Sequence, residues 1–541
     1  MKEYIVVVKP GEDLTTLDSE MSANTGSGAV PNRAVECSDA CPQDTRMTHW
    51  KLTDEEAKTL EGDARILAVE LPYEDMPHII RKQSAWQSTT FNKTSANDGV
   101  NWGLSRCSSQ INNFEGNTSI FDNYKYAMTG EGVDFVVFDS GIEVNHPEFQ
   151  DASGALRVMQ LDWFANHNGV TNPYAAQGPL GAGFYTDTGG HGTHCAGIAA
   201  GKTYGWAKNA HIYSMKIFDT DKLTDTLGMD LIRFWHQNKG NNRPTIVNMS
   251  YAYSYVIDGW DGTAAGDTGQ HWDTFTNQMD VWNFGDPNFA TAIEVNTETD
   301  IEYASYWAPS YRSAAVDAKL DQLVAAGVHV TIAGNNNYEV QYNYSDDAND
   351  NYNDFFSRPS FAGGAAVHYH RGSSPRASTV KNAEIIVTNI GVTEYNNKEV
   401  LSPSSACGEA MDINAPGTNI TSSCSTDTSS AGGRSVSDYP ADPNFKILSL
   451  SGTSMAAPQV CGVGALYLEA DPTLTPAELK AKILHDAKTG LLHDVPTWDQ
   501  KDLSKYYHFG IAQHRGLFGG PNKVLYNRYV GDVFVRYVAA G

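Results

Sequence analysis

The sequence has few cysteines, few basic residues and no long apolar run. Its seven cysteines, an odd number in 541 residues, do not form the even, closely spaced set of a small disulfide-stabilised domain. Its 64 acidic residues outnumber the 38 basic ones, which gives a formal net charge of −26. Such acidity disfavours binding to nucleic acid or anionic lipid, and no apolar run has the length of a membrane span. We therefore expect neither nucleic acid nor a membrane as a partner.

The amino terminus lacks the pattern of a secretory signal. Its apolar core is short, no small-residue cleavage site follows, and Lys9-Pro10 ends it. We expect the protein to be intracellular or to be released as part of a larger particle.

Cysteine spacing does not predict a metal centre. Cys37 and Cys41 lie close together, but no second Cys or His pair follows them, which argues against a zinc site. Cys195 and Cys461 lie in small-residue segments and are expected to be buried free thiols.

An uncharged stretch, residues 447–468, shows where chemistry is expected. It begins with a short apolar alternation, crosses Gly452-Thr453-Ser454 and continues with small and apolar residues, which predicts a strand or loop turning into a buried helix. Ser454 would lie in the first turn, where unpaired N–H groups and the helix dipole favour developing negative charge. A serine there is a nucleophile if a base accepts its proton, and otherwise only a helix cap.

Polar residues upstream follow predicted buried strands or begin a predicted helix. The apolar run 133–138 ends at Asp139, and the strand predicted at 328–333 precedes Asn335. A glycine-flanked segment, 189–201, predicts a second small-residue helix that contains His191. Sites in open α/β folds lie at the carboxyl ends of parallel strands, so these side chains are expected to meet there.

Five motifs in this order resemble the subtilisin-like serine proteases, the peptidase S8 family, and in particular their proteinase K branch. The motifs are Asp-Ser-Gly at 139–141, His-Gly-Thr-His-Cys-Ala-Gly at 191–197, Ala-Gly-Asn at 333–335, Ala-Pro-Gly at 415–417 and Gly-Thr-Ser-Met-Ala-Ala-Pro at 452–458. The chain order Asp, His, Ser is that of subtilisin. The resemblance implies an α/β, three-layer fold with a mostly parallel central sheet.

The resemblance also implies roles for four side chains. His191 would be the general base, oriented by Asp139, and Ser454 the nucleophile. Asn335 and the Ser454 N–H would stabilise the oxyanion. His194, one helical turn after His191, is expected to face the interior.

The substrate cleft would be lined by two further segments, which contain Ser250, Tyr251, Ala252, Ala333 and Gly334. Where the family has Ser-Leu-Gly-Gly, this chain has Ser250 followed by Tyr-Ala-Tyr. The bulky aromatics predict narrower or differently shaped first subsites.

Residues 1–80 form a separate small α+β domain in this interpretation. Strands are predicted at 4–8 and 65–71 and a helix at 55–60, with Thr53 and Glu56 as its capping box; residues 11–45 show no clear periodicity. The segment resembles the inhibitory propeptide of subtilisin-like proteases, although an unrelated α+β domain fits the pattern too. Residues 81–100 would be the linker and processing zone, and 101–541 the catalytic domain.

Two insertions are expected in the catalytic domain, at about 254–310 and 336–375. The second contains a run rich in Asp and Asn, 345–354. Its oxygen atoms suit Ca²⁺, which the family often binds, but a solvated loop explains the run as well. No cofactor is required for the chemistry, and the metal content stays open. The tail beyond Gly490 alternates aromatic and basic residues and is expected to form an edge hairpin or assembly surface.

The predicted function is that of a serine endopeptidase made as a self-processing zymogen. Its partners would be a polypeptide substrate and its own propeptide, with the oligomeric state left open. The alternative is a catalytically silent subtilisin-fold scaffold or binding protein within a larger assembly, which the insertions and the altered cleft strand favour.

Overall fold

The computed structural model divides the chain into two compact units, Met1–Gln83 with Val533–Gly541, and Ser84–Asp532. It describes residues 1–9, 12–23, 33–39, 47–70, 79–83, 85–92, 101–108, 119–218, 223–254, 310–311, 314–336, 339–341, 355–358, 367–370, 383–395, 398–427, 436–494, 516–517, 519–529 and 533–537.

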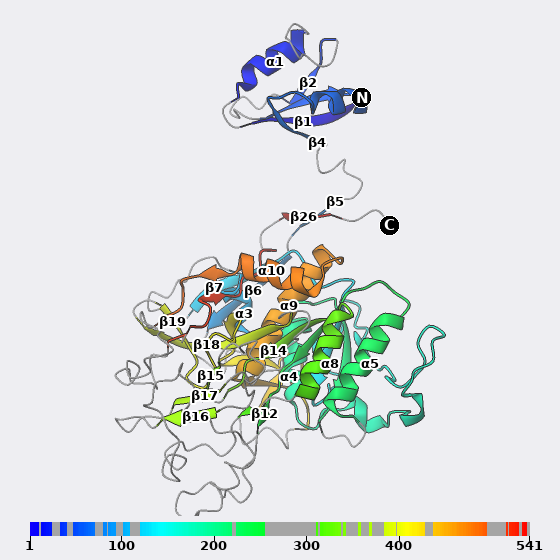
Figure 1. The fold of residues 1–541 in the computed structure, drawn as a ribbon, viewed down its shortest axis with the longest axis vertical. Helices are drawn as coiled ribbons and strands as arrows, with labels where there is room; N and C mark the ends of the chain where they lie inside the picture. Colours follow the sequence, from blue (N-terminus) through cyan, green and yellow to red (C-terminus); the bar gives the residue numbers. More distant parts are fainter. Residues whose placement is uncertain are drawn as a thin grey trace, which may run out of the picture. The chain divides into compact units, whose positions relative to one another are not determined.

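The smaller unit has an antiparallel sheet with the strand order β2-β3-β1-β4 (Figure 1). Its elements are β1 (Lys2–Val8), α1 (Leu14–Ala23), β2 (Cys37–Asp39), β3 (Met47–Leu52), α2 (Asp54–Leu60) and β4 (Ile66–Glu70). Alternate residues of β1, Tyr4, Val6 and Val8, are buried in one core with both helices, as the period of a strand requires. The predicted capping box of α2 is confirmed, since Thr53 and Glu56 bond each other's backbone N–H.

Helix α1 corrects the expectation that 11–45 has no periodic element. Its buried residues are Leu14, Leu17 and Met21, which lie on one helical face at three- and four-residue spacing. Only these three positions carry the pattern, and the polar residues between them obscure it in the sequence.

The predicted linker and tail contain strands that pair with distant segments. Strand β5 (Ile79–Gln83) pairs with β26 (Val533–Tyr537), and β6 (Ala85–Asn92) pairs with β7 (Ser119–Tyr126). Much of 81–100 is therefore extended strand, while 93–100 lies outside the described residues. The tail strand β26 joins β5, while residues 495–515 of the tail lie outside the described residues.

The larger unit is built on a sheet of ten described strands. Its order is β24-β25-β20-β18-β14-β11-β8-β10-β9, with β19 beside β18. The strands are β8 (Asp134–Asp139), β9 (Val158–Met159), β10 (His211–Lys216), β11 (Thr245–Met249), β14 (His329–Ala333), β18 (Ile385–Tyr395), β19 (Lys398–Leu401), β20 (Ile413–Pro416), β24 (Lys488–Thr489) and β25 (Lys523–Val524). The path from β9 to β25 is parallel throughout, and only β19 and β24 pair antiparallel.

Helices cover both faces of this sheet. They are α3 (Trp102–Arg106), α4 (His191–Ala200), α5 (Asp225–Asn238), α8 (Ala314–Ala325), α9 (Thr453–Ala470) and α10 (Pro476–Asp486), with short 3₁₀ turns η2 (Pro147–Phe149), η3 (Ala175–Gln177) and η4 (Ala182–Tyr185). Helices α5 and α8 lie side by side (Figure 1) and share a core with Val136 and Phe138, whereas α9 approaches Ile246 of β11 through Gly464. The predicted three-layer α/β fold is confirmed.

Smaller sheets accompany the central sheet. The two-stranded sheet is β12 (Tyr253–Ser254) with β13 (Ser310–Tyr311), so the ends of the first predicted insertion pair with each other. The others are β15 (Glu339–Gln341), β17 (Val367–His370) and β16 (Phe355–Arg358), and β21 (Ile420–Cys424), β23 (Asp442–Leu450) and β22 (Ser437–Tyr439). Residues 255–309 and the acidic run 345–354 lie outside the described residues. No helix in the described part of the chain is long and apolar enough to cross a membrane.

Parallel register brings three strand ends together. Met249 of β11 pairs with Phe138 of β8 on one side and with Ile332 of β14 on the other. Asp139, Ser250 and Ala333 come next along their strands, so they leave the sheet at the same edge. Helix α4 begins at His191 and helix α9 begins at Thr453. These two helices supply the other side chains of the site.

Candidate active site

Asp139 and His191 form a close pair at the carboxyl edge of the sheet. Nδ1 of His191 lies 2.8 Å from Oδ1 and 3.0 Å from Oδ2 of Asp139. Asp139 is only 1% exposed, whereas the His191 side chain is 35% exposed. A carboxylate bound at Nδ1 favours the tautomer that carries its proton there and leaves Nε2 able to accept a second proton.

Two glycines allow the imidazole to approach this strand. Gly190, which precedes α4, has φ of 71°, a left-handed conformation that costs other residues free energy. A Cβ at Gly192 would collide with the carbonyl oxygen of Gly141 and lie 3.2 Å from Cβ of Asp139. The glycine-rich entry predicted from the sequence therefore lets the first turn of α4 pack directly against the Asp139 loop.

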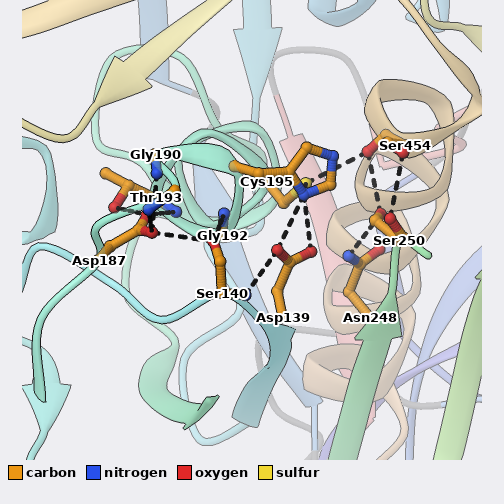
Figure 2. A network of polar contacts seen from close by, with 12 residues as sticks. Asp139, Ser140, Asp187, Gly190, Gly192, Thr193, Cys195, Asn248, Ser250 and Ser454 are labelled. Carbon is orange, nitrogen blue, oxygen red and sulfur yellow. Dashed lines mark hydrogen bonds and ion pairs between the residues drawn. The ribbon is translucent and has the colours of Figure 1, made fainter. Parts of the chain in front are cut away.

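Ser454 lies at the second position of α9 and is half-buried. Its hydroxyl donates to the carbonyl oxygen of Ser250 at 3.1 Å, and the Ser250 hydroxyl donates to the carbonyl oxygen of Ser454 at 2.9 Å. Asn248 in turn donates to the Ser250 hydroxyl at 2.8 Å. This ladder, drawn in Figure 2, fixes the start of α9 to the end of β11.

Cys195 touches both halves of the site. Its sulfur lies 3.9 Å from Nδ1 of His191 and 3.3 Å from the carbonyl oxygen of Ser454 (Figure 2). The imidazole and the Ser454 residue are therefore neighbours. The predictions that Cys195 and Cys461 are buried free thiols are confirmed.

Charge and burial set the proton affinities of these groups. Burial lowers the pKa of His191, but the charge and hydrogen bond of Asp139, together with the neighbouring Cys195, raise it by more in sum, so that this pKa lies well above its ordinary value. Burial raises the pKa of Cys195, which stays a thiol at neutral pH. The protonated form of the His191 imidazole is thus stabilised.

Asn335 and Asn336 connect β14 to the start of helix α9. Asn335 is buried with φ of 88°, and its Oδ1 accepts a hydrogen bond from the Asn336 N–H at 2.6 Å. Oδ1 of Asn336 accepts from the N–H (2.7 Å) and the hydroxyl (3.0 Å) of Thr453. Asn336, in the segment that follows β14, thereby caps α9. The N-cap residue itself, Gly452, has no side chain that could do so.

The predicted cleft residues lie near the strand ends. Ser250, Ala333 and Gly334 are buried, and Gly334 packs so closely on β18 that a Cβ would lie 2.9 Å from the Val387 carbonyl oxygen. Ala252 and Tyr251 are half-buried.

The Tyr251 ring stacks on Phe138 with ring centres 5.8 Å apart and meets Phe218 edge-on at 5.6 Å. Phe218 is 42% exposed. Tyr251, which directly follows Ser250, is thus anchored on the core.

The other predicted histidine role is structural. His194 is completely buried, and its Nε2 lies 2.9 Å from the carbonyl oxygen of Leu448. The prediction that it faces the interior is confirmed.

One group of described residues has the composition of a metal site. Ligand atoms of Asp139, His191 and Cys195 lie within 4.8 Å of one another. The Asp139 carboxylate already accepts from Nδ1 of His191, so an ion bound here would have to replace that hydrogen bond.

Two residues of the site were missed in the sequence. Asp187 binds the first turn of α4 and the Asp139 loop, and Asn336 caps α9. An Asp shortly before a glycine-flanked helix start is a capping signal that could have indicated the first. The second depends on a contact 117 residues away along the chain, for which the sequence offers no local signal.

Comparisons with known proteins identify the family of this chain. Residues 130–510 match the subtilase family, peptidase S8, which is more than half of the chain. Subtilisin-like protease 8 of Trichophyton verrucosum is 24% identical over 80% of this chain and 65% of its own length. Subtilisin-like proteinase Spm1 of Pyricularia oryzae is 26% identical over 76% of this chain and 57% of its own length.

A solved cold-adapted subtilisin-like serine proteinase overlaps 79% of this chain and 98% of its own, with 20% identity and a TM-score of 0.43. The fold and the strand-edge cluster define an α/β protein of the subtilisin type. The chain belongs to the subtilase family, as its five motifs predicted. It spans less than two thirds of the length of the two fungal relatives.

Proposed function

We propose that this chain is a serine endopeptidase that hydrolyses peptide bonds in polypeptide substrates, with Ser454 as nucleophile. The observation that carries the proposal is the pairing of His191 Nδ1 with both oxygens of Asp139, in a site where Cys195 contacts both the imidazole and Ser454. Membership of the subtilase family supports the same reaction.

In the proposed reaction His191 accepts the Ser454 proton at Nε2 while Oγ attacks the scissile carbonyl carbon. The proton then passes to the leaving amine as the C–N bond breaks, and an acyl-enzyme remains. Water attacks the ester by the same route and releases Ser454. Asp139 holds the imidazole tautomer and stabilises the imidazolium.

The resting hydroxyl must turn before it reacts, because it donates to the Ser250 carbonyl oxygen in this structure. Rotation about the Cα–Cβ bond of Ser454 redirects that hydrogen. Hydrogen bonds between a nucleophile and its base often tighten only when substrate binds. The proposed reaction therefore requires a change of one side-chain rotamer and no movement of the backbone.

The oxyanion would be stabilised by Asn335 and the Ser454 N–H. Ser454 is the second residue of α9, so its N–H has no acceptor within the helix. Asn335 follows the neighbouring strand, and its amide is oriented by the Asn336 N–H. Loss of one such donor costs roughly 100- to 1000-fold in rate in a related site.

The proposal includes synthesis as a self-processing zymogen. Residues 1–83 belong to a compact unit with its own core, as an inhibitory propeptide would require. Helix α3 belongs to the other unit and is held there by the buried ion pair of Arg106 with Glu399. A cut before residue 101 would leave that anchor intact.

A gel of purified protein tests both parts. Wild type should shed about the first 80 to 100 residues and then digest a denatured protein substrate, whereas Ser454→Ala should do neither. Correctly folded wild type that stays full length and cleaves no substrate, even after limited trypsin removal of residues 1–83, would support the silent-scaffold alternative.

A further inference from the structure

Asp187 is a buried carboxylate that lies four residues before His191. It is 3% exposed. Its Oδ1 accepts hydrogen bonds from the Ser140 hydroxyl (2.8 Å) and from the N–H groups of Gly189 (3.1 Å) and Gly190 (2.8 Å). Its Oδ2 accepts from the N–H (2.9 Å) and the hydroxyl (2.6 Å) of Thr193. Five donors thus converge on one side chain.

These donors come from both sides of the proposed base. Ser140 follows Asp139 directly, and its own N–H donates to Asp139 Oδ1 at 2.7 Å. The Ser140 hydroxyl also accepts from the Gly192 N–H at 2.9 Å. Figure 2 shows Asp187, Ser140 and Asp139 as one connected network beside the start of α4.

The first turn of α4 depends on this carboxylate. Gly190, its N-cap, has no side chain to accept the free N–H groups of the turn. Asp187 accepts hydrogen bonds from three backbone N–H groups, those of Gly189 and Gly190 before His191 and that of Thr193 after it. The negative charge also complements the positive end of the helix dipole.

We propose that Asp187 is a positioning residue that holds the imidazole of His191 against the carboxylate of Asp139. It binds the backbone on both sides of His191 and reaches Asp139 through Ser140. The role rests on the proposed peptidase function, since it concerns the geometry of that same base. Asp187 does not touch the reacting atoms.

An amide in place of this carboxylate cannot make the same contacts. In the Asp187→Asn variant, the single amide oxygen would accept from one set of donors, while the NH₂ group would face the N–H or hydroxyl groups of the other set. The turn must then shift, which lengthens the contact between His191 and Asp139. Misplacement by about 1 Å is worth about 100-fold in rate.

Two measurements on the full chain test the role. For Asp187→Asn we expect kcat per active site, titrated with a fluorophosphonate, to fall about 100-fold with little change in KM. The second measurement is an NMR titration of His191 in a Ser454→Ala background, which prevents autolysis. Adding Asp187→Asn to that background should bring the pKa of His191 closer to its ordinary value of about 6.5.

Asp134→Asn is the matched control. Asp134 is a completely buried carboxylate at the opposite end of β8, paired with Lys239 and Arg243 at 2.7 Å each. Its loss should lower thermal stability while kcat and the His191 titration stay as in wild type. If Asp187→Asn does not fold, Ser140→Ala carries the test, with an expected fall in kcat of about tenfold, the rate equivalent of one hydrogen bond.

The outcomes separate the two proposals. Wild-type kcat and wild-type His191 titration in the folded variant would overturn the role of Asp187, as would equal changes in the Asp134→Asn control. If the wild-type protein does not react with a fluorophosphonate, the peptidase function is refuted instead. The NMR titration needs no turnover and would still decide whether Asp187 positions His191.

Discussion

Replacing Asn336 by alanine removes the cap of helix α9 without changing the identity of Asp139, His191 or Ser454. Oδ1 of Asn336 accepts two hydrogen bonds from Thr453, at 2.7 and 3.0 Å, and Thr453 is completely buried. Without that oxygen a buried N–H and hydroxyl lose their acceptor. Loss of a cap and of buried hydrogen bonds predicts a decrease of about 1 to 3 kcal/mol in the free energy of unfolding.

The same substitution should slow catalysis, because Ser454 is the next residue in that turn. A small shift of the turn displaces both the Ser454 hydroxyl and its N–H from the reacting carbonyl. We expect kcat to fall about 10- to 100-fold, with KM little changed. Asn336→Asp keeps an acceptor oxygen at the helix start and should recover most of the loss.

Thr475→Ala is the matched control for this experiment. Thr475 caps the next helix, α10, through a capping box with Glu478. Its loss should cost about 0.5 to 2 kcal/mol in stability and leave kcat unchanged. Urea unfolding in a Ser454→Ala background measures the first quantity, and initial rates on a peptide anilide, normalised by active-site titration, measure the second. If Asn336→Ala and Thr475→Ala show the same kcat, the assigned coupling between cap and nucleophile is wrong.

Three further outcomes are expected. Asp139→Asn should lower kcat by about 10⁴-fold, because the amide favours the wrong imidazole tautomer; steady-state rates check this. Since His191 must be neutral to accept a proton and its pKa is raised, kcat/KM should fall as pH falls through a midpoint above about 6.5, and a profile flat down to pH 5 would contradict the pairing. Arg106→Ala leaves the buried Glu399 carboxylate without its partner and should cost about 3 to 5 kcal/mol of stability in urea unfolding, with kcat per folded molecule unchanged.

Local patterns in the sequence predicted much of this fold. The predicted capping box of Thr53 involves residues three apart, and it is present. The apolar run before Asp139 predicted a strand buried on both faces, which β8 is. Features of this kind can be predicted from the sequence because caps and periodicity depend on residues that are close together along the chain.

Elements that depend on distant partners were not predicted. Strand β6 was placed in a linker because its partner β7 follows a long intervening segment. Helix α1 was missed because only three apolar residues mark its buried face.

Part of the site was equally hidden. Asp187 meets the Ser140 hydroxyl across 47 residues, and Asn336 meets Thr453 across 117. The residues proposed to do chemistry were readable from motifs, whereas those that hold them in position required the tertiary structure.

Covalent labelling of wild-type protein by a fluorophosphonate tests the central claim most directly. After release of residues 1–83, peptide mass spectrometry should find stoichiometric modification at Ser454 and nowhere else, with none in the Ser454→Ala or His191→Ala proteins. Folded wild type that remains unlabelled at pH 8, or that labels equally well without His191, would contradict an imidazole-activated serine.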